Sequence, residues 1–336
     1  MNFFITGGTG FVGTHLTNLL SKRFPKSVIY NLDIIPPGQP LPTVKDYHPA
    51  LKNGQKLASQ FIYCDVRKPI EVGVPVSSDD VIFNLAAVHR TPGHEDKEYF
   101  ETNIRGAENI CEFAQKYGIR KILFTSSIAP YGASEALKEE STLPMPNTAY
   151  GISKLVAEKI HMMWQGADSD ERQLTIVRPG VVFGLGENGN FTRLYWSIRG
   201  GKFAYPGRKD TIKACIYVKE LVSFMVYQME NAVGVNLFNC TYEPAFHINQ
   251  IVESMKKVTR INRRVMLIPT WVLMPAAAIL GALGSPMGIC PARVRKLMVS
   301  TNICGKRMAD SGYQFNWSFE GALEDWFEDN SRLGLT

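Results

Sequence analysis

The sequence is poor in cysteine and has no paired-cysteine motif. Its six cysteines are spread over 336 residues, and no two of them have the Cys-x-x-Cys spacing. In a chain of this size, that pattern predicts reduced, mostly buried thiols in a cytosolic protein rather than a disulfide framework. The six histidines show no metal-ligand spacing, so we expect no metal site. His89 and His94, on either side of a Pro-Gly loop, are interpreted as surface polar groups.

A strong excess of charge of one sign is also missing. The 37 Lys and Arg residues against 31 Asp and Glu residues leave a net charge of +6, without a basic tail. This excludes a nucleic-acid partner of the usual basic-tail type and suits an anionic substrate or an anionic surface. The chain starts directly with a strand-like run, Asn2 to Thr6, and shows no charged segment followed by an apolar one. We therefore expect no signal peptide and a cytoplasmic protein.

One long segment, residues 265–292, contains no charged residue at all. Its 28 residues exceed the roughly 20 that a helix needs to cross a bilayer. Four prolines and three glycines interrupt the segment, and basic residues flank both of its ends, so it shows no inside–outside asymmetry. This favours an apolar helix that packs in a second lobe or at a dimer contact. The alternative is association with a membrane surface, peripheral to the inner face of the membrane, and a true span is the least favoured interpretation.

The sequence does have a regular alternation of short apolar runs and amphipathic stretches in its first half. Strands alternating with helices imply right-handed crossovers and a parallel sheet, so we predict an α/β fold of the Rossmann, doubly wound type. A smaller mixed C-terminal lobe is expected to bind the substrate. We place the cofactor domain at residues 1–180, with a returning segment at about 211–235, and the lobe at 181–210 and 236–336. The predicted strands are Phe3–Thr6, Val28–Asp33, Phe61–Asp65, Val81–Leu85, Lys121–Ser126 and Leu174–Arg178, and the predicted helices are Val12–Ser21, Tyr99–Tyr117 and Ala149–Trp164.

A glycine-rich run, Thr6 to Gly13, follows the first predicted strand and precedes a helix. Gly7 lets the chain turn sharply out of the strand, and Gly10 lets the backbone approach a pyrophosphate at the start of the helix. Gly13 lets the helix pack closely on the sheet. Because the strand and the helix are in the required places, the motif predicts a dinucleotide site.

Two acidic residues at strand ends are the next candidates. Asp33 follows Gly13 by 20 residues, where a carboxylate accepts hydrogen bonds from the adenosine ribose and repels a 2′-phosphate. We therefore predict NAD rather than NADP as the cofactor. Asp65 is placed near the adenine, with a simple turn-forming role as the alternative.

Tyr150 and Lys154 are four residues apart and therefore lie on one face of a predicted helix. A tyrosine, with an ordinary pKa near 10, needs a neighbouring cation to act as a base near neutral pH, and Lys154 supplies that charge. Ser127, just after a predicted strand, can hydrogen-bond the same substrate hydroxyl.

These motifs together resemble the extended short-chain dehydrogenase/reductase superfamily, in particular the NAD-dependent epimerase/dehydratase family that acts on nucleotide sugars. The resemblance covers Met1 to about Asn330. It rests on Thr6–Gly13, Asp65-Val66, Asn84 to Ala87, Asn103-x-x-Gly106, Ser126-Ser127-x-x-Pro130-Tyr131-Gly132, Tyr150-x-x-x-Lys154 and Arg178-Pro179-x-x-Val182-x-Gly184.

The resemblance implies that Ser127, Tyr150 and Lys154 are the catalytic residues. It also implies a homodimer built through the helices Tyr99–Tyr117 and Ala149–Trp164. The residues expected to bind or position NAD are Gly7, Gly10, Phe11, Val12, Asp33, Asp65, Val66, Leu85, Ala86, Ala87, Asn103, Thr125, Tyr150, Lys154, Pro179 and Val182.

The residues expected to contact the substrate depart from the usual pattern of the family. Many family members that act on sugar nucleotides carry Arg-Asp before the strand that here begins at Cys215, whereas this chain has Lys213-Ala214. Lys213 or Arg208 is therefore expected to contact the substrate diphosphate, with Arg295 as a further candidate, and Ser127 and Tyr150 are expected to contact the sugar. The apolar stretch and the basic run that starts at Arg293 look like a subgroup of bacterial O-antigen and capsule pathways.

Three functions follow from this resemblance. The first is 4-epimerisation of a nucleotide-linked or lipid-diphosphate-linked sugar through a 4-keto intermediate. The second is reduction of a 4-keto sugar or another carbonyl compound, steroid-like substrates included, and the third is a non-catalytic NAD sensor. Dehydration is disfavoured because Ile128 and Ala129 stand where similar dehydratases carry an acidic pair.

Overall fold

The computed structural model of the chain describes residues 1–39, 50, 56–89, 94–282, 291 and 298–336. A seven-stranded sheet forms its centre, in the order β12-β7-β5-β4-β1-β2-β3, and all neighbouring strands are parallel. The fold class is confirmed as a Rossmann-type α/β sheet. The strands of this sheet are β1 (Phe3–Thr6), β2 (Ile29–Asp33), β3 (Gln60–Tyr63), β4 (Val81–Asn84), β5 (Lys121–Thr125), β7 (Gln173–Pro179) and β12 (Val235–Cys240).

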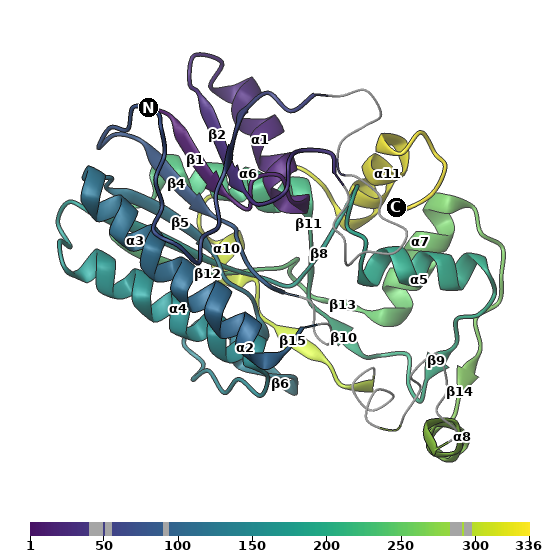
Figure 1. Ribbon diagram of the computed structural model, residues 1–336. Coiled ribbons are helices and arrows are strands. Elements are labelled where there is room, and N and C mark those ends of the chain that lie inside the picture. Colours follow the sequence, from purple (N-terminus) through teal and green to yellow (C-terminus); the bar gives the residue numbers. More distant parts are fainter. Residues whose placement is uncertain (40–49, 51–55, 90–93, 283–290, 292–297) are drawn as a thin grey trace.

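Helices cover both faces of this sheet (Figure 1). On one face lie α1 (Phe11–Arg23) and α6 (Val218–Asn231), and on the other lie α3 (Arg105–Tyr117) and α4 (Ala149–Gly166). Side chains alternate along each strand, so Phe3 and Ile5 of β1 pack toward α1, whereas Phe4 between them packs toward α3. The central strands are therefore buried on both faces, which explains their continuous apolar sequences.

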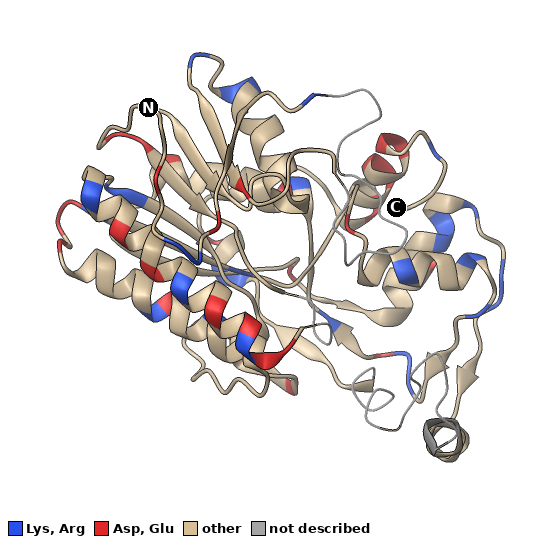
Figure 2. Cartoon of the chain, in the orientation of Figure 1, with Lys and Arg blue, Asp and Glu red and all other residues tan. Residues whose placement is uncertain are grey.

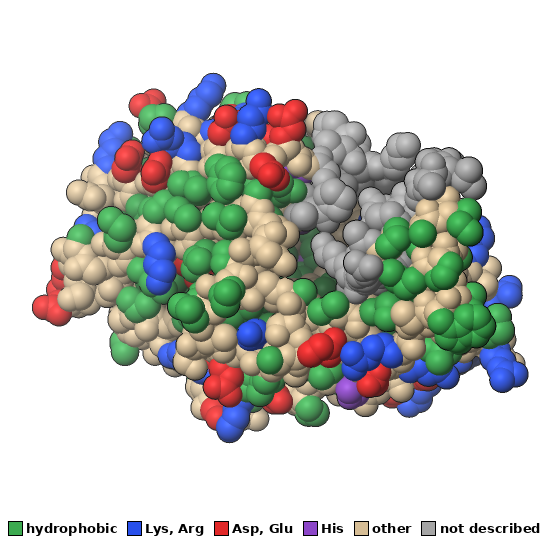
Figure 3. Space-filling model, turned by 90° about the horizontal axis from the view of Figure 1, so that it is seen from below, with side chains coloured by type: hydrophobic (Ala, Val, Ile, Leu, Met, Phe, Trp, Pro, Cys, Tyr) green, Lys and Arg blue, Asp and Glu red, His purple; other side chains and the backbone are tan. Residues whose placement is uncertain are grey.

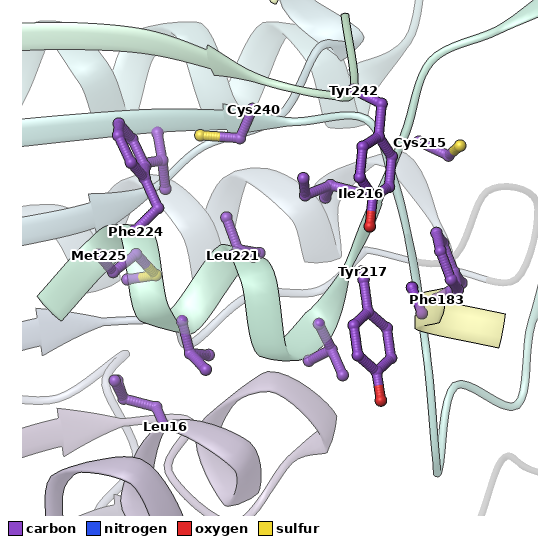
Figure 4. Packing of buried hydrophobic residues seen from close by; sticks show 14 of the residues in the cluster. Leu16, Phe183, Cys215, Ile216, Tyr217, Leu221, Phe224, Met225, Cys240 and Tyr242 are labelled. Atoms are coloured by element: carbon purple, nitrogen blue, oxygen red, sulfur yellow. The ribbon is translucent and has the colours of Figure 1, made fainter. Parts of the chain in front are cut away.

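The first of these two cores continues beyond the sheet. Leu221 and Met225 of α6 lie in it together with Leu16 of α1 (Figure 4). Phe183 and Tyr217, from two strands outside the main sheet, extend the same cluster, and their ring centroids are 5.5 Å apart. One continuous core thus joins the sheet to the C-terminal half of the chain.

Smaller elements make up the rest of the described chain. Short sheets pair β13-β10-β15-β6, β11-β8 and β14-β9. These elements are α2 (Asp96–Tyr99), η1 (Phe100–Ile104), η2 (Ala129–Tyr131), β6 (Ser134–Lys138), β8 (Val181–Phe183), α5 (Asn190–Arg199), β9 (Tyr205–Pro206), β10 (Ile212–Lys213), β11 (Cys215–Tyr217), β13 (Phe246–His247), α7 (Ile248–Thr259), β14 (Leu267–Ile268), α8 (Thr270–Ala282), β15 (Thr301–Ile303), α10 (Lys306–Ala309) and α11 (Phe319–Asp329).

After the short strands β8 to β11, the chain returns to the main sheet at β12. β12 pairs with β7 from Val235 to Cys240, so the returning segment continues past the expected end at about 235. The division into a cofactor domain and a substrate lobe otherwise stays a prediction. Four cysteines are buried as free thiols and Cys304 is half-buried, while Cys290 lies outside the described residues.

Candidate active site

The carboxyl ends of the parallel strands meet at one edge of the sheet, which is where ligands bind in open α/β folds. The turn from β1 into α1 is shaped by glycines. Gly7 has a φ of +68°, and a side chain there would lie 2.9 Å from the backbone nitrogen of Ala86. At Gly13 a Cβ atom would lie 2.5 Å from the carbonyl oxygen of Gly7. Gly7 is therefore required by the sharp turn, as predicted. Gly13 is required because α1 packs against the turn itself, at Gly7 and Gly8, where the sequence predicted packing on the sheet.

Gly10 occupies the N-cap of α1. Because glycine has no side chain, Gly10 cannot cap the first backbone amides of the helix, which belong to Phe11 and Val12. Free amides and the helix dipole at such a terminus stabilise a diphosphate. The narrow turn and the open helix start fit the pyrophosphate of a dinucleotide.

Asp33 lies at the end of β2 beside this turn. Its Oδ2 atom accepts hydrogen bonds from the backbone nitrogen and the hydroxyl of Thr9, at 3.2 and 2.8 Å. Its Oδ1 atom accepts from the backbone nitrogen of Ile34 at 2.8 Å. These bonds hold the carboxylate beside the glycine turn, and its contact with the adenosine ribose stays a prediction.

Asp65, after β3, has a different local role. Its carboxylate accepts from the backbone nitrogen of Arg67 at 3.1 Å and from the Arg67 guanidinium at 2.6 Å. These bonds hold the pKa of the Asp65 carboxyl below its usual range. The turn-forming role is therefore present, and the contact with adenine stays a prediction. Val66 is buried, and its carbonyl accepts from the Asn109 side chain at 2.7 Å.

Asn103 connects the loop after β4 to the catalytic helix. Its Oδ1 atom accepts from the backbone nitrogen of Val88 at 2.9 Å, and its Nδ2 atom donates to the Val88 carbonyl at 3.1 Å. The same Nδ2 atom donates to the Ser153 hydroxyl at 2.9 Å. Asn103 lies in η1, a π-helical turn, and such turns are frequent at functional sites. It therefore positions the chain next to Leu85, Ala86 and Ala87.

The other predicted cofactor residues end neighbouring strands. Thr125 ends β5, and its hydroxyl lies 4.0 Å from the sulfur of Met225. Pro179 ends β7, and its carbonyl accepts from the backbone nitrogen of Ile128 at 3.2 Å. Val182 lies in β8. Their contacts with NAD remain predictions.

Tyr150 and Lys154 lie one turn apart on α4, and Ser127 follows the end of β5 by two residues. Their catalytic roles stay a prediction. The Ser127 hydroxyl lies near enough to the Tyr150 phenol to lower its pKa, and it accepts a hydrogen bond from the backbone nitrogen of Ala129 at 3.1 Å. Lys154 is almost fully buried, with its ammonium 4.5 Å from the ring centroid of Phe124. The ring of Tyr99 lies 6.1 Å from that of Tyr150.

The electrostatics of these groups follow from their burial. Burial raises the pKa of Tyr150, and the hydrogen bond from Ser127 opposes this shift. Burial lowers the pKa of Lys154 to about 7, and the charge of Glu158 acts in the opposite direction. Lys154 is thus close to its titration point near neutral pH, where small changes of nearby charge alter its protonation.

Two buried charged residues next to this centre had no role in the sequence prediction. Glu158 lies one helical turn after Lys154, and Arg178 of β7 donates to it from Nε at 2.8 Å and from Nη2 at 2.5 Å. The Ser126 hydroxyl donates to the same carboxylate at 2.5 Å. The signal for Glu158 was its spacing of four from Lys154, which places both side chains on one helix face.

The expected contacts with the substrate diphosphate stay predictions. Arg208 pairs with Asp210 at 2.7 Å and with Glu135 at 3.1 Å, so its charge is already compensated by two carboxylates. Lys213, on β10, donates to the Val299 carbonyl at 2.9 Å, and burial lowers its pKa to about 8. Arg295 lies outside the described residues.

The described residues contain no group of three or more His, Cys, Asp and Glu side chains that could hold a metal ion. In the parts of the chain that the structure covers, no helix is both long and apolar enough to cross a membrane.

A family model for the NAD-dependent epimerase/dehydratase family matches residues 3–240. The chain belongs to this family. The cofactor is therefore NAD, in agreement with the glycine turn and with Asp33, and the enzyme is a sugar epimerase or oxidoreductase of the extended short-chain dehydrogenase type.

Two of the curated relatives are named for different substrates, a lipid-linked sugar and a steroid. The chain is 28% identical over 333 residues to the N-acetyl-α-D-glucosaminyl-diphospho-ditrans,octacis-undecaprenol 4-epimerase of Escherichia coli O157:H7, covering 96% of this chain and 93% of that protein. It is 27% identical over 241 residues to a 3-β-hydroxysteroid dehydrogenase of Mycolicibacterium neoaurum, covering 68% of this chain and 61% of that protein.

Solved structures confirm the fold over nearly the full length. The UDP-glucose 4-epimerase of Thermotoga maritima superposes with a TM-score of 0.73 at 18% identity, covering 99% of each chain. The UDP-N-acetylglucosamine 4-epimerase of Methanobrevibacter ruminantium gives a TM-score of 0.73 at 20% identity and covers 98% of each chain.

Proposed function

We propose that this family member interconverts the two epimers at carbon 4 of a 2-acetamido sugar that is linked through a diphosphate to a polyprenyl lipid. The observation that carries the proposal is the link between the glycine turn and the helix of Tyr150 and Lys154. Gly7 lies against Ala86, and Asn103 joins the nearby Val88 to Ser153 on that helix. Ile128 and Ala129 follow Ser127, so no acidic pair stands there to expel a hydroxyl, which disfavours dehydration.

In the proposed reaction, Tyr150 as phenolate removes the proton of the sugar 4-hydroxyl. Lys154 stabilises the phenolate through its positive charge, and Ser127 donates a hydrogen bond to the sugar oxygen as charge develops on it. NAD, when bound, supplies the acceptor and later the donor of the hydride at carbon 4. After the 4-keto sugar has rotated, Tyr150 returns the proton to its oxygen, so neither enzyme nor cofactor is consumed.

The lipid carrier is supported by two observations. The relative that matches along nearly the whole chain is named for an undecaprenyl-linked substrate. In addition, the structure exposes an apolar helix, α8, which is described below. For the diphosphate we propose Lys213, because Arg208 is already paired with Asp210 and Glu135. The reaction would belong to bacterial surface polysaccharide synthesis.

Proton NMR tests this function directly. Purified protein with trace NAD is given either UDP-N-acetylglucosamine or a short-chain polyprenyl-diphosphate-linked N-acetylglucosamine in detergent. Appearance of the axial 4-epimer from the lipid-linked sugar, without accumulation of NADH, supports the proposal. Conversion of the nucleotide sugar alone contradicts the lipid carrier. If neither sugar changes and a 4-keto sugar consumes NADH, the protein is a reductase.

The proposed membrane contact rests on α8. This helix carries no charged residue and projects at the lower right of the molecule (Figures 1 and 2). Trp271 is 78% exposed and Ile279 is 62% exposed, whereas Ala277 is buried. Hydrophobic side chains also gather on this side in the space-filling view (Figure 3). With 13 residues, α8 is shorter than the roughly 20 needed for a span, which suits a helix lying in the interface.

Charge complementarity supports an anionic bilayer as the proposed occupant of this surface. Arg263 and Arg264 are exposed just before β14, which leads into α8. Basic residues beside an interfacial helix attract anionic lipids, each contributing about 1 kcal/mol near the surface.

Co-sedimentation with vesicles tests the contact. We expect binding to vesicles that contain phosphatidylglycerol, weaker binding to pure phosphatidylcholine, and at least tenfold weaker binding after the double substitution Trp271→Ser/Ile279→Ser. Leu333→Ser, at a site that is 73% exposed, is the matched control. Unchanged binding of the double variant would contradict the assignment, and a change of its oligomeric state would assign the surface to a second copy instead.

We also propose a homodimer through α3 and α4, which pack side by side (Figure 1). Ile152 and Met163 are exposed on one face of α4, at 40% and 74%. Light scattering should give a dimer for the wild type and a shift toward monomer for Met163→Glu. Leu333→Glu serves as control, and a monomeric wild type would contradict this proposal.

A further inference from the structure

Glu158 and Arg178 form a charge pair inside the protein, behind the catalytic helix. Glu158 is 0% exposed and Arg178 is 3% exposed. The pair joins two elements that are adjacent to the catalytic centre, because Glu158 lies on α4 and Arg178 lies on β7. Taking two charges out of water is costly, and an apolar pair of similar size often stabilises a fold equally well. Stability alone therefore does not explain the pair.

The charge pair contacts the chain on both sides of Ser127. Ser126 donates to Glu158 at 2.5 Å and directly precedes Ser127 at the end of β5. On the other side, the Arg178 guanidinium lies 4.7 Å from the ring centroid of Tyr131, in the turn after Ser127. The Tyr131 hydroxyl in turn donates to Asn239 of β12 at 2.9 Å. The segment that carries Ser127 is thus held at its start and at its end by the same buried pair.

The third contact is electrostatic. Glu158 follows Lys154 by four residues, so the two side chains lie on one face of α4, one helical turn apart, and the charge of Glu158 acts on Lys154. Arg178 already compensates the charge of Glu158, and the three residues together leave one positive charge in the interior.

We propose that Glu158 and Arg178 are positioning residues of the catalytic centre: they fix the Ser127 segment, and the opposite charges of the pair set how readily Lys154 keeps its proton. The inference rests on the proposed function, because it assigns these residues to that reaction's proton relay.

The other groups near Lys154 do not replace the pair. On α4, Tyr150 precedes it by one turn, and His161 follows it by two. Burial lowers the pKa of His161 to about 4, so this side chain is neutral near pH 7. From other elements, Tyr99 of α2 packs against Tyr150, and Tyr131 of η2 lies under Arg178. Burial raises the pKa of Tyr131, which is therefore also neutral near pH 7.

The decisive experiment follows the protonation of Lys154 itself and needs neither sugar nor NAD. Protein labelled with ¹³C-lysine is titrated by NMR, and the ε-methylene signal of Lys154 is assigned by its absence in Lys154→Met. In Glu158→Gln the lysine faces only the positive charge of Arg178, so its titration midpoint should fall by about one unit, a tenfold change in acidity. In Arg178→Gln the unpaired carboxylate should move the midpoint upward.

The Lys154 titration midpoint should shift in opposite directions in the two variants. Simple structural damage would not shift it downward in one variant and upward in the other. Glu220→Gln is the matched control, because Glu220 is equally buried but is bound to Tyr313, Asn316 and Trp317. Its Lys154 midpoint should equal that of the wild type. An unchanged midpoint in Glu158→Gln, or shifts of the same sign in both variants, would overturn the proposal.

Ser126→Ala tests the positioning of Ser127 with both charges of the pair retained. We expect kcat for 4-epimerisation to fall by about tenfold with unchanged KM and an unchanged Lys154 midpoint, while Ser21→Ala has no effect. A wild-type kcat would overturn this part. If the wild type converts no sugar but its Lys154 responds as stated, the proposed function fails and the role of the pair in setting the protonation of Lys154 stands.

Discussion

Asn103 and Ser153 are joined by a hydrogen bond of 2.9 Å between the Asn103 amide and the Ser153 hydroxyl. Ser153 stands directly before Lys154, and its hydroxyl also donates to the Tyr150 carbonyl at 2.9 Å. Because Asn103 also holds both backbone groups of Val88, one side chain links the loop beside the expected nicotinamide position to the catalytic helix.

Replacement of Asn103 should therefore weaken the binding of NAD. In Asn103→Ala three hydrogen bonds are lost, each contributing about 1 kcal/mol. We expect the Kd of NAD to rise by about tenfold or more, measured by isothermal titration calorimetry. Asn236→Ala, at a half-buried position where the side chain donates to the Val233 carbonyl, is the control. An unchanged Kd would show that Asn103 does not position the loop.

Gly13 should not tolerate even a methyl group. In Gly13→Ala the new Cβ atom would meet the Gly7 carbonyl oxygen at 2.5 Å and displace α1 from the turn. We expect a loss of about 1–3 kcal/mol in the free energy of unfolding, together with weaker NAD binding. Gly166→Ala is the matched control, because open space surrounds that helical position, and it should stabilise the protein by about 0.5–1 kcal/mol. Urea unfolding measures both, and equal midpoints for the two variants would refute the packing argument.

The carboxylate of Asp33 should decide between NAD and NADP. In Asp33→Ser the acceptor for the ribose hydroxyls and the negative charge that repels a 2′-phosphate are both removed. We expect the Kd of NAD to rise by about tenfold and the preference over NADP to shrink by a larger factor. Cofactor titrations of the wild type, Asp33→Ser and the exposed-site control Asp79→Ser measure this. If Asp33→Ser keeps the full preference for NAD over NADP, a residue other than Asp33 discriminates between the two cofactors.

Removal of the Tyr150 hydroxyl should abolish turnover and leave cofactor binding intact. We expect kcat of Tyr150→Phe to fall by about 10²–10⁴-fold, the usual contribution of a positioned general base. Tyr227→Phe, whose hydroxyl bonds the Ser311 carbonyl away from this site, should keep full activity. Substantial activity of Tyr150→Phe would eliminate this residue as the base.

The buried Lys154 should make stability depend on pH. Its pKa is about 7 in the folded chain and 10.5 in the reference state, so between these values the unfolded chain binds more protons. Stability should therefore rise with pH. The slope from this lysine should be about 0.7 kcal/mol per unit at pH 7 and approach about 1.4 kcal/mol per unit between pH 8 and 9.5. Urea unfolding of the wild type and Lys154→Met at several pH values isolates this slope. Parallel pH profiles for the two proteins would contradict it.

The sequence alone was sufficient where function depends on residues close together in the chain. Gly7, Gly10 and Gly13 specify a turn and a helix start, and Tyr150 with Lys154 specify one helix face by their spacing of four. The strands were also predictable, because burial on both faces of a parallel sheet requires continuous apolar runs such as Phe3–Thr6.

Only the tertiary structure decided which distant charges meet. Arg178 reaches Glu158 across 20 residues, and Glu135 reaches Arg208 across 73. The first pair lies buried behind the catalytic helix, and the second gives a predicted diphosphate ligand a carboxylate partner. Burial works in the same way: it lowers the pKa of Lys154 to about 7, whereas Trp271 on α8 is left in contact with solvent. Local spacing sets which side chains share a face, but the packing of distant elements sets their charge partners and their exposure to water, and the sequence pattern does not encode those distances.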